Sequence, residues 1–326
     1  MILVISFFVL LVLLLLAFYI ANKMVRHTNW YKNNFVHTHQ FDVPTEDKSL
    51  DIVNLGSNPA LFSLFYEDMR GENWATGSQS PTMDLAILKT YHERLKEGGV
   101  VLIPIVAFSS CSPYLDKYKP SWHDDKYYAR FAKVLGDNDE APRVIPNLAH
   151  IKRWMKHPLW YNRNAWRFLI RDCNEDNRRW ETEQKMQLPE LERDADRWMA
   201  GWMREFDIKD LNAPLDTKME KCHEECARMF ADIVDYCKKH NFKPYLLFPP
   251  VSRVLAKRFS DKTKETYIYS FVRRIQTMTE VEFLDYITDK DFSDPSLYFN
   301  SFFLNLRGRK LFTRKVLEDI GLSNLK

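Results

Sequence analysis

The sequence predicts an α/β protein with a parallel sheet, preceded by one membrane-spanning helix. Three observations support this prediction in a chain of 326 residues. The first 22 residues carry no charged side chain. Beyond residue 48, short apolar stretches alternate with stretches of helical periodicity, the order typical of a parallel sheet covered by helices on both faces. A Trp-rich segment over residues 109–214 interrupts this alternation.

The composition is that of a folded protein with a balanced surface charge. Hydrophobic residues make up 45% of the chain and charged residues 28%, which suits a packed core and not a disordered chain. Lys and Arg number 47 against 44 Asp and Glu. This balance argues against a dedicated nucleic-acid binder, so no nucleic-acid partner is expected. Five cysteines are an odd number and too few for a disulfide framework.

The N-terminal apolar run is predicted to anchor the chain in a membrane. Residues 2–20 are almost all Ile, Leu, Val and Phe. As a helix they span roughly 30 Å, the thickness of the hydrocarbon core. A cleaved signal peptide usually has a basic start and a shorter apolar run. We therefore expect an uncleaved transmembrane anchor over residues 1–22, followed by a polar tether over residues 23–48.

The charges beside the apolar run predict its orientation. Lys23, Arg26 and Lys32 follow it, and no basic residue precedes it. By the positive-inside rule, this pattern places the rest of the chain in the cytoplasm.

The body beyond residue 48 alternates strands and helices. Apolar stretches predict strands over residues 50–56, 73–76, 100–106, 243–249 and 281–286. Helical periodicity and turn residues predict helices over residues 59–69, 81–96, 216–240, 262–279 and 307–320. The α/β domain is therefore expected to comprise residues 49–108 and 215–326.

Residues 109–214 are predicted to form a mostly helical insertion in this domain. From Arg143 to Arg179 nine basic residues stand against three acidic ones, and acidic residues dominate from Glu181 to Asp196. Two interpretations stay open for this segment. It forms either solvated helix faces packed on tryptophans or a lid that faces a membrane surface or a glycan.

Candidate site residues gather in the loops that follow the predicted strands, where parallel α/β sheets form their binding sites. These loops are Gly56-Ser57-Asn58, Gly77-Ser78-Gln79, Phe108-Ser109-Ser110, Pro249-Pro250 and residues 291–305. They bring several hydroxyl and amide side chains to one edge of the expected sheet.

Two of the loops form a pair of motifs. The first strand ends in Val53-Asn-Leu-Gly-Ser-Asn58, and the last block reads Asn300-Ser-Phe-Phe-Leu-Asn-Leu-Arg-Gly-Arg309. Over residues 50–106 and 215–320 the chain resembles the SGNH (GDSL-type) hydrolase and acyltransferase family. The resemblance implies a flavodoxin-like, three-layer parallel sheet. Its membrane-anchored subgroup implies an extracytoplasmic role in modifying teichoic acid or exopolysaccharide, against the local charge pattern.

The chain departs from that family at the catalytic positions. Asn58 stands at the position of the nucleophilic Ser, Asn300 at that of the Asp, and Phe303 at that of the His. Neither Asn ionises and Phe accepts no proton, so these positions cannot activate a nucleophile. The residues expected to form the pocket and an oxyanion-like turn are Gly56, Asn73, Gly77, Ser78, Gln79 and Ser109.

Three functions compete on this evidence. In the first, the chain is a non-catalytic member of the family. It then binds an acyl group, a glycan or teichoic acid, or it assists a membrane-bound acyltransferase or acyl carrier. Alternatively, Ser57 acts as a displaced nucleophile in an active O-acyltransferase or esterase. A third interpretation is an unrelated doubly wound protein, although neither a Gly-x-Gly-x-x-Gly motif nor a phosphate-binding loop is present.

No cofactor and no metal are expected. Cys222 and Cys226, with His223 between them, share one face of a predicted helix. A zinc site needs further ligands at a recognisable spacing, and the sequence offers no second pair.

Overall fold

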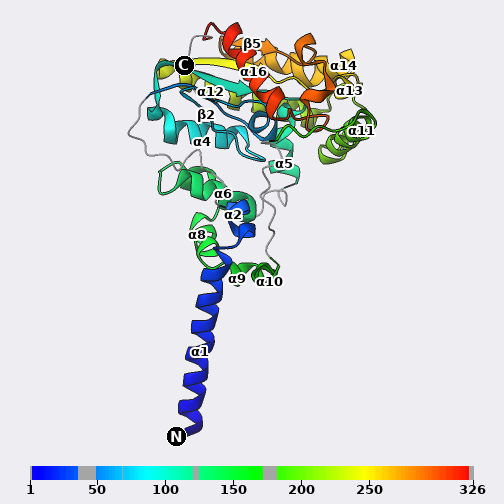
Figure 1. Ribbon diagram of the computed structural model, residues 1–326. Coiled ribbons are helices and arrows are strands. Elements are labelled where there is room, and N and C mark those ends of the chain that lie inside the picture. Colours follow the sequence, from blue (N-terminus) through cyan, green and yellow to red (C-terminus); the bar gives the residue numbers. More distant parts are fainter. Residues whose placement is uncertain (1, 36–48, 68, 120–124, 172–181, 323–326) are drawn as a thin grey trace. The chain divides into compact units, whose positions relative to one another are not determined.

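A computed structural model describes residues 2–35, 49–67, 69–119, 125–171 and 182–322 (Figure 1). The chain forms two compact units. Unit 1 combines residues 1–39 with 123–177, and unit 2 combines residues 40–122 with 178–326. The predicted insertion over 109–214 thus contributes helices to both units.

Unit 2 is an α/β domain with a five-stranded, all-parallel sheet, as the sequence predicts. The strand order is β2-β1-β3-β4-β5. The strands are β1 (Leu50–Asn54), β2 (Gly71–Asn73), β3 (Leu95–Pro104), β4 (Lys243–Phe248) and β5 (Glu282–Asp285). Residues 99–104 of β3 are buried, because β3 lies at the centre of the sheet.

Helices cover the sheet in separate layers. α12 (Thr217–Lys239) packs between α4 (Pro81–Tyr91) and α15 (Ser270–Met278). The short α3 (Asn58–Leu61) and the last helix, α16 (Leu306–Asp319), make contact through the Arg309 side chain. Since the strand order reverses between β1 and β3, right-handed connections place these two groups on opposite faces.

The long α11 and several short helices complete unit 2. They are η3 (Ser109–Cys111), α5 (Ser112–Tyr118), α11 (Leu188–Glu205), α13 (Arg253–Ala256), α14 (Asp261–Lys264), the π-helical turn η7 (Glu265–Tyr269), η8 (Lys290–Phe292) and η9 (Pro295–Leu297). The predicted helix over residues 262–279 is therefore one element with a π turn inside it.

Three predicted boundaries in unit 2 are wrong. The strand expected over residues 73–76 is β2, which lies over Gly71–Asn73 instead. The helix expected over residues 81–96 ends at Tyr91, apart from the 3-10 turn η2 (His92–Arg94), and β3 begins at Leu95. The Gly98-Gly99 pair lies inside this strand, where Gly98 has φ +72° and the ladder between β1 and β3 is irregular. The helix expected over residues 59–69 stops at Leu61, because side chains from other elements bind its last carbonyl groups.

Unit 1 is helical. It comprises α1 (Ile2–Val25), α2 (Asn29–Phe35), α6 (Asp125–Leu135), α7 (Ala141–Val144), α8 (Leu148–Lys156), α9 (Pro158–Tyr161), η5 (Arg163–Trp166) and α10 (Arg167–Ile170). Part of the segment predicted as a tether is helical, since α1 continues to Val25 and α2 follows it. The rest of that tether, residues 36–48, and the tryptophans Trp122 and Trp180 lie outside the described residues.

Among the described residues, one helix is long and apolar enough to cross a membrane. It covers Val4–Val25 with a mean hydropathy of 3.0. Its length and composition fit a single-pass anchor and equally a signal sequence.

Candidate functional site

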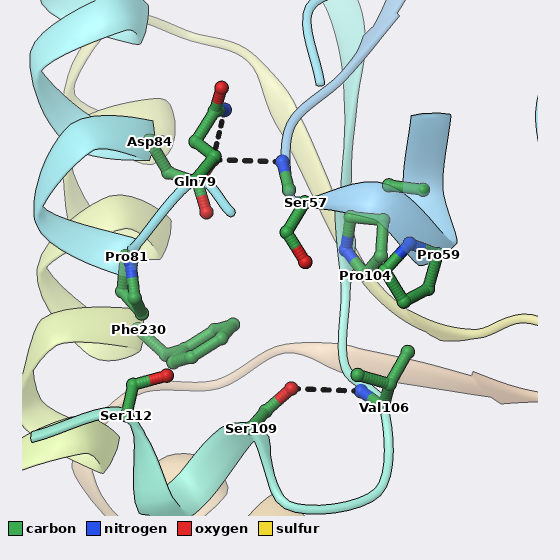
Figure 2. A pocket seen from close by; sticks show the side chains of 12 residues that line it. Ser57, Pro59, Gln79, Pro81, Asp84, Pro104, Val106, Ser109, Ser112 and Phe230 are labelled. Carbon is green, nitrogen blue, oxygen red and sulfur yellow. Dashed lines mark hydrogen bonds between the residues drawn. The ribbon is translucent and has the colours of Figure 1, made fainter. Parts of the chain in front are cut away.

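A small pocket lies in unit 2 at the carboxyl ends of β1 and β3 (Figure 2). This is the point where the strand order reverses, and ligands of doubly wound α/β proteins bind at such switch points. The cavity has a volume of about 50 Å³. Its polar side chains are Ser57, Gln79, Asp84, Ser109 and Ser112, and its apolar walls include Pro59, Pro81, Pro104 and Phe230.

The turn after β1 directs Ser57 into this pocket. Gly56 has φ +109°, and a Cβ at this position would lie 2.9 Å from the Cβ of Ala60, so the turn requires glycine. Ser57 precedes α3 with extended backbone and forms no capping hydrogen bond through its side chain. The Ser57 hydroxyl therefore does not cap α3, and Figure 2 shows it directed into the pocket.

Asp84 is the ionisable group of the pocket. Its Oδ1 accepts hydrogen bonds from the Gly56 amide at 2.8 Å and from Gln79 Nε2 at 2.5 Å. The residue is only 4% exposed, and burial raises the pKa of its carboxyl to about 6, although both hydrogen bonds oppose the rise. Asp84 thus joins the first turn of α4 to the loop that carries Ser57.

The loop after β3 supplies the remaining hydroxyl groups. Phe108 takes a left-handed backbone with φ +68°, a costly conformation for an aromatic residue. Its ring is buried against Trp202 at 5.3 Å and Tyr267 at 4.9 Å between ring centroids, which stabilises the turn. Beyond the turn, Ser109 Oγ accepts a hydrogen bond from the Val106 amide at 2.9 Å, and Ser112 begins α5.

The three positions expected to correspond to the SGNH triad do not line this pocket. Asn300 Oδ1 accepts hydrogen bonds from the amides of Phe302 at 2.9 Å and Phe303 at 2.7 Å, so Asn300 closes a turn. The Phe303 ring is 8% exposed and packs edge-on against Phe62, at 4.7 Å between centroids. Asn58 is partly exposed at the start of α3.

An aromatic cluster fills the place around Phe303. Trp198 on α11 lies 5.6 Å from Phe303 and 5.1 Å from Phe302, and Trp202 lies 5.1 Å from Phe302. Ser57 and Asn300 are therefore not joined in one polar site. Ser57, Gln79, Gly56 and Ser109 share the pocket, whereas Asn300 belongs to a packed loop.

The expected oxyanion-like turn has a structural function at Asn73. The side-chain Nδ2 of Asn73 donates to the carbonyl oxygens of Ala60, Leu61 and Leu64. Its Oδ1 accepts from Asn54 Nδ2 at 2.8 Å. All its hydrogen-bonding capacity is used within the fold. Gly77 and Ser78 do not line the pocket, and Ser78 is exposed with φ +62°.

The last motif also serves the fold. Asn305 caps α16 by accepting from the Gly308 amide at 3.0 Å. Gly308 lies so close to the Leu297 carbonyl that a side chain would collide with it. Arg309 donates to the carbonyls of Leu61 and Leu64 at 3.0 and 2.9 Å. The motif therefore supports the turn after α3.

Asp84, Ser112 and Phe230 are pocket residues that the sequence did not indicate. Asp84 is a single buried carboxylate in the first turn of a helix, where an acidic residue commonly serves the helix dipole. The sequence feature that could have indicated Asp84 is its position close to Gln79, at the start of a helix that follows a strand. Phe230 comes from α12, far along the chain, so only the packing of α12 beside α4 brings it here.

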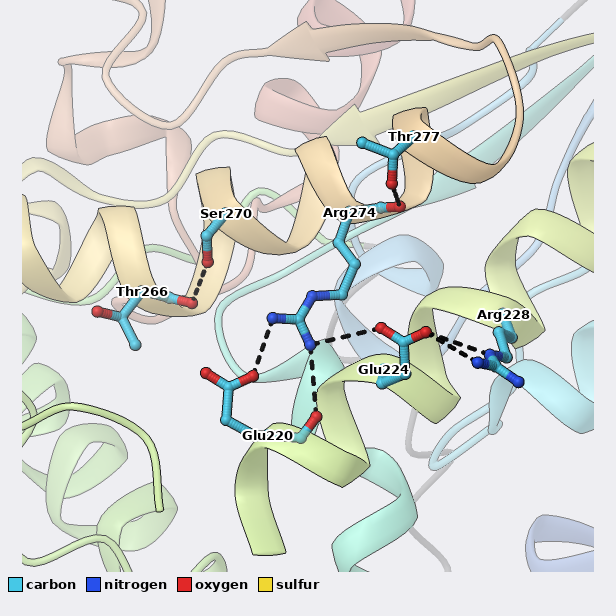
Figure 3. Close-up of polar contacts among 7 residues, drawn as sticks. All are labelled: Glu220, Glu224, Arg228, Thr266, Ser270, Arg274 and Thr277. Atoms are coloured by element: carbon cyan, nitrogen blue, oxygen red, sulfur yellow. Dashed lines mark hydrogen bonds and ion pairs between the residues drawn. The ribbon is translucent and has the colours of Figure 1, made fainter. Parts of the chain in front are cut away.

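The Cys-His-Glu-Glu-Cys segment lies on α12 and does not line the pocket, although Cys226 Sγ donates to the carbonyl of the lining residue Ser109 at 3.2 Å. His223 is 1% exposed, with Nε2 at 3.8 Å from the Cys111 Sγ. Burial, aided by the charge of Arg274, lowers the pKa of His223 to about 3. Figure 3 shows Arg274 of α15 bound to Glu220 and Glu224 on α12, which joins the two helices.

The cysteines of the described residues form neither disulfides nor part of a metal site. Cys111, Cys222, Cys226 and Cys237 are buried and free, and Cys173 lies outside the described residues. Within the described residues, no group of three or more His, Cys, Asp or Glu side chains is arranged to hold a metal ion.

Comparison with known proteins assigns no family. The chain matches no protein-family model, and it matches none of the curated proteins.

Proposed function

We propose that the chain is a membrane-anchored, SGNH-like accessory protein of cell-surface polysaccharide or teichoic acid modification, which binds an acyl group without transferring it. One observation carries this proposal. Ser57 lines an open pocket, whereas Phe303, at the position of the family's catalytic base, is packed among aromatic rings. Among the described residues that line the pocket there is no imidazole, the usual base for a serine hydroxyl.

The size of the pocket favours a small ligand group. A volume of about 50 Å³ accommodates about three to five heavy atoms, if each takes the roughly 10–15 Å³ that one water needs. Whole sugars and nucleotides need sites of about 300 Å³ or more. An acetyl or similar ester group attached to a polymer is the better match, with the polymer outside the pocket.

The chemistry of the lining supports the same ligand. The hydroxyls of Ser57 and Ser112 are hydrogen-bond donors for an ester carbonyl. Phe230 and the prolines offer apolar contact to a methyl group. Partners that fit this role are a membrane-bound acyltransferase or an acyl carrier that presents the group.

The packing of α1 supports its retention as an anchor. Val25 is fully buried in unit 1 and Asn22 is 2% exposed. Asn22 Oδ1 accepts a hydrogen bond from the Leu159 amide at 2.9 Å. Removal of α1 as a signal sequence would delete these contacts, so we include the helix in the mature protein.

Modification of a surface polymer requires unit 2 to lie outside the cytoplasm, although the basic residues after α1 predict the opposite. C-terminal fusions to alkaline phosphatase and to green fluorescent protein would decide between the two. An active phosphatase fusion is expected. A fluorescent fusion with inactive phosphatase would contradict the envelope role.

Ligand binding can be tested on the purified full chain in detergent. Saturation-transfer NMR with an O-acetylated saccharide should show contact through the acetyl methyl protons. The variant Ser112→Leu, which fills the pocket, should lose that signal, and Ser296→Ala, outside the pocket, should keep it. Equal signals in both variants would contradict the proposed site.

A second candidate function is an esterase or acyltransferase with Ser57 as a displaced nucleophile. It is favoured by the presence of Ser57 and Asp84 in one pocket, where Asp84 with a pKa of about 6 is ionised at neutral pH. A fluorophosphonate probe would then label the chain. Labelling lost in Ser57→Ala and Asp84→Asn but kept in Asn58→Ala would establish this enzyme and exclude the accessory role.

A further inference from the structure

We propose that residues 158–171 form a juxtamembrane collar that lies in the lipid headgroup region beside the end of α1. The collar consists of α9, η5 and α10. The proposal rests on the retention of α1 as a membrane anchor, argued above, and all its contacts lie within unit 1.

Packing holds the collar at the carboxyl end of the apolar helix. α9, η5 and α10 each contact α1, and they extend sideways from it (Figure 1). The Trp160 ring lies edge-on to Phe18, with 6.0 Å between centroids. Phe18 precedes the last apolar residue of the run, Ile20, by two positions, about 3 Å along the helix axis. Trp160 therefore lies at the depth where the hydrocarbon core ends.

The collar is attached on its other side to α2. Phe168 of α10 stacks on Trp30, with 4.5 Å between centroids and 5° between ring planes. Tyr31 donates from its hydroxyl to the Met155 carbonyl at 2.8 Å. These contacts, with the Asn22–Leu159 bond, set the height of the collar along α1.

The collar exposes large apolar side chains. Trp160 is 69% exposed, Trp166 48% and Ile170 75%. Outside α1, the other exposed large hydrophobic residues of the described chain are Tyr118, Leu188 and Met278. Half of this set thus falls within one short segment beside the membrane helix. Tryptophan at this depth is typical of membrane interfaces, where its ring is apolar and its N–H remains hydrated.

The charge around the collar matches lipid phosphate. Residues 141–171 contain no Asp or Glu. Exposed cationic side chains lie at the end of α1 and on the helices α8 and α10 of the same unit, namely Lys23, Arg26, Arg153, Lys156, Arg167 and, directly after α10, Arg171. An apolar edge flanked by cations is the pattern of a segment that lies in the interface and binds anionic headgroups. Continuity with α1 and this charge favour a bilayer over a second protein chain as the occupant.

The test uses the full chain in nanodiscs of phosphatidylcholine and phosphatidylglycerol, brominated near the headgroup end of the acyl chains. Bromine quenches tryptophan fluorescence at short range. We expect quenching of the wild type and loss of more than half of the quenched fraction in Trp160→Phe/Trp166→Phe. The matched control Trp198→Phe, from the aromatic cluster of unit 2, should keep the wild-type quenched fraction.

Charge is tested by a second variant. Arg167→Gln/Arg171→Gln should lower the quenched fraction at least twofold in anionic discs and leave it unchanged in purely zwitterionic discs. An unchanged quenched fraction in the tryptophan double variant would place these side chains against protein, such as a second copy of the chain, and would overturn the proposal.

Failure of the anchor is distinguishable from failure of the collar. An intact mass that lacks α1 would overturn both. A full-length chain that enters the discs, but whose quenched fraction is the same in wild type and in Trp160→Phe/Trp166→Phe, would overturn the collar alone.

Discussion

Asp194 accepts two hydrogen bonds from Ser301 through one carboxylate oxygen, from the amide at 3.0 Å and from the hydroxyl at 2.6 Å. Ser301 is fully buried, and its carbonyl accepts from the Ser252 amide at 3.1 Å. The contact joins α11 to the loop that carries Phe303. A helix from the predicted insertion thus holds the degenerate block in its packed conformation.

Ser301→Ala should lower the free energy of unfolding of unit 2 by about 2 kcal/mol, because a buried hydrogen bond to a charged group is lost. Urea unfolding of the full chain in detergent, followed by tryptophan fluorescence, measures the change. Ser296→Ala is the matched control. Its hydroxyl also donates to a carboxylate, Asp294 at 2.6 Å, but at the surface, so its effect should stay below about 0.5 kcal/mol. Equal losses in the free energy of unfolding for the two variants would show that the buried contact adds no more stability than the surface contact.

Phe303→Ala should destabilise unit 2 by about 3 kcal/mol, because it removes a buried ring that contacts Phe62, Trp198 and Phe302. Phe303→Leu keeps most of the volume and should cost about 1 kcal/mol. The same urea experiment applies. A neutral Phe303→Ala would mean that this position is free for chemistry, against its assignment as a packing residue.

Asp84→Asn should change the pH dependence of stability. The folded pKa of about 6 lies above the ordinary pKa of 3.8 for an unfolded Asp. The folded state therefore binds the proton more tightly, and its stability falls as pH rises from about 4 to 6. Between pH 5 and pH 7 this amounts to about 1 kcal/mol, a loss that should be absent in Asp84→Asn. Unfolding curves of both proteins at the two pH values give the difference, and parallel slopes would contradict the assignment.

His223→Phe should have the opposite effect on the pH slope. The folded pKa of His223, about 3, lies below the ordinary pKa of 6.5 for an unfolded His. Its contribution to stability is present above pH 6.5 and is lost as pH falls through the window down to about 3. Wild type should lose about 2 kcal/mol between pH 7 and pH 5 from this group alone. The variant should lack that loss, which the same unfolding curves measure. A variant as acid-sensitive as wild type would show that His223 is not buried in neutral form.

Local sequence was sufficient for the elements that depend on composition and short-range pattern. The apolar run of α1, the buried β3 core and the glycine turn at Gly56 could all be predicted, because each follows from residue types over a few positions. The parallel order of the sheet followed from the alternation of strands and helices. The residue types at Asn58, Asn300 and Phe303 already excluded a Ser-His-Asp triad at those positions.

Tertiary structure decided where elements end and which side chains meet. Periodicity favoured a long helix after Ser57, but Asn73 and Arg309 bind the carbonyls that such a helix would need, so it stops at Leu61. Tertiary structure also divided the insertion between the two units. Periodicity identifies the buried face of a helix but not the element against which that face packs. Asp84 became a pocket residue only when α4 packed beside the β1 loop, since burial and a raised pKa arise from neighbours distant in sequence.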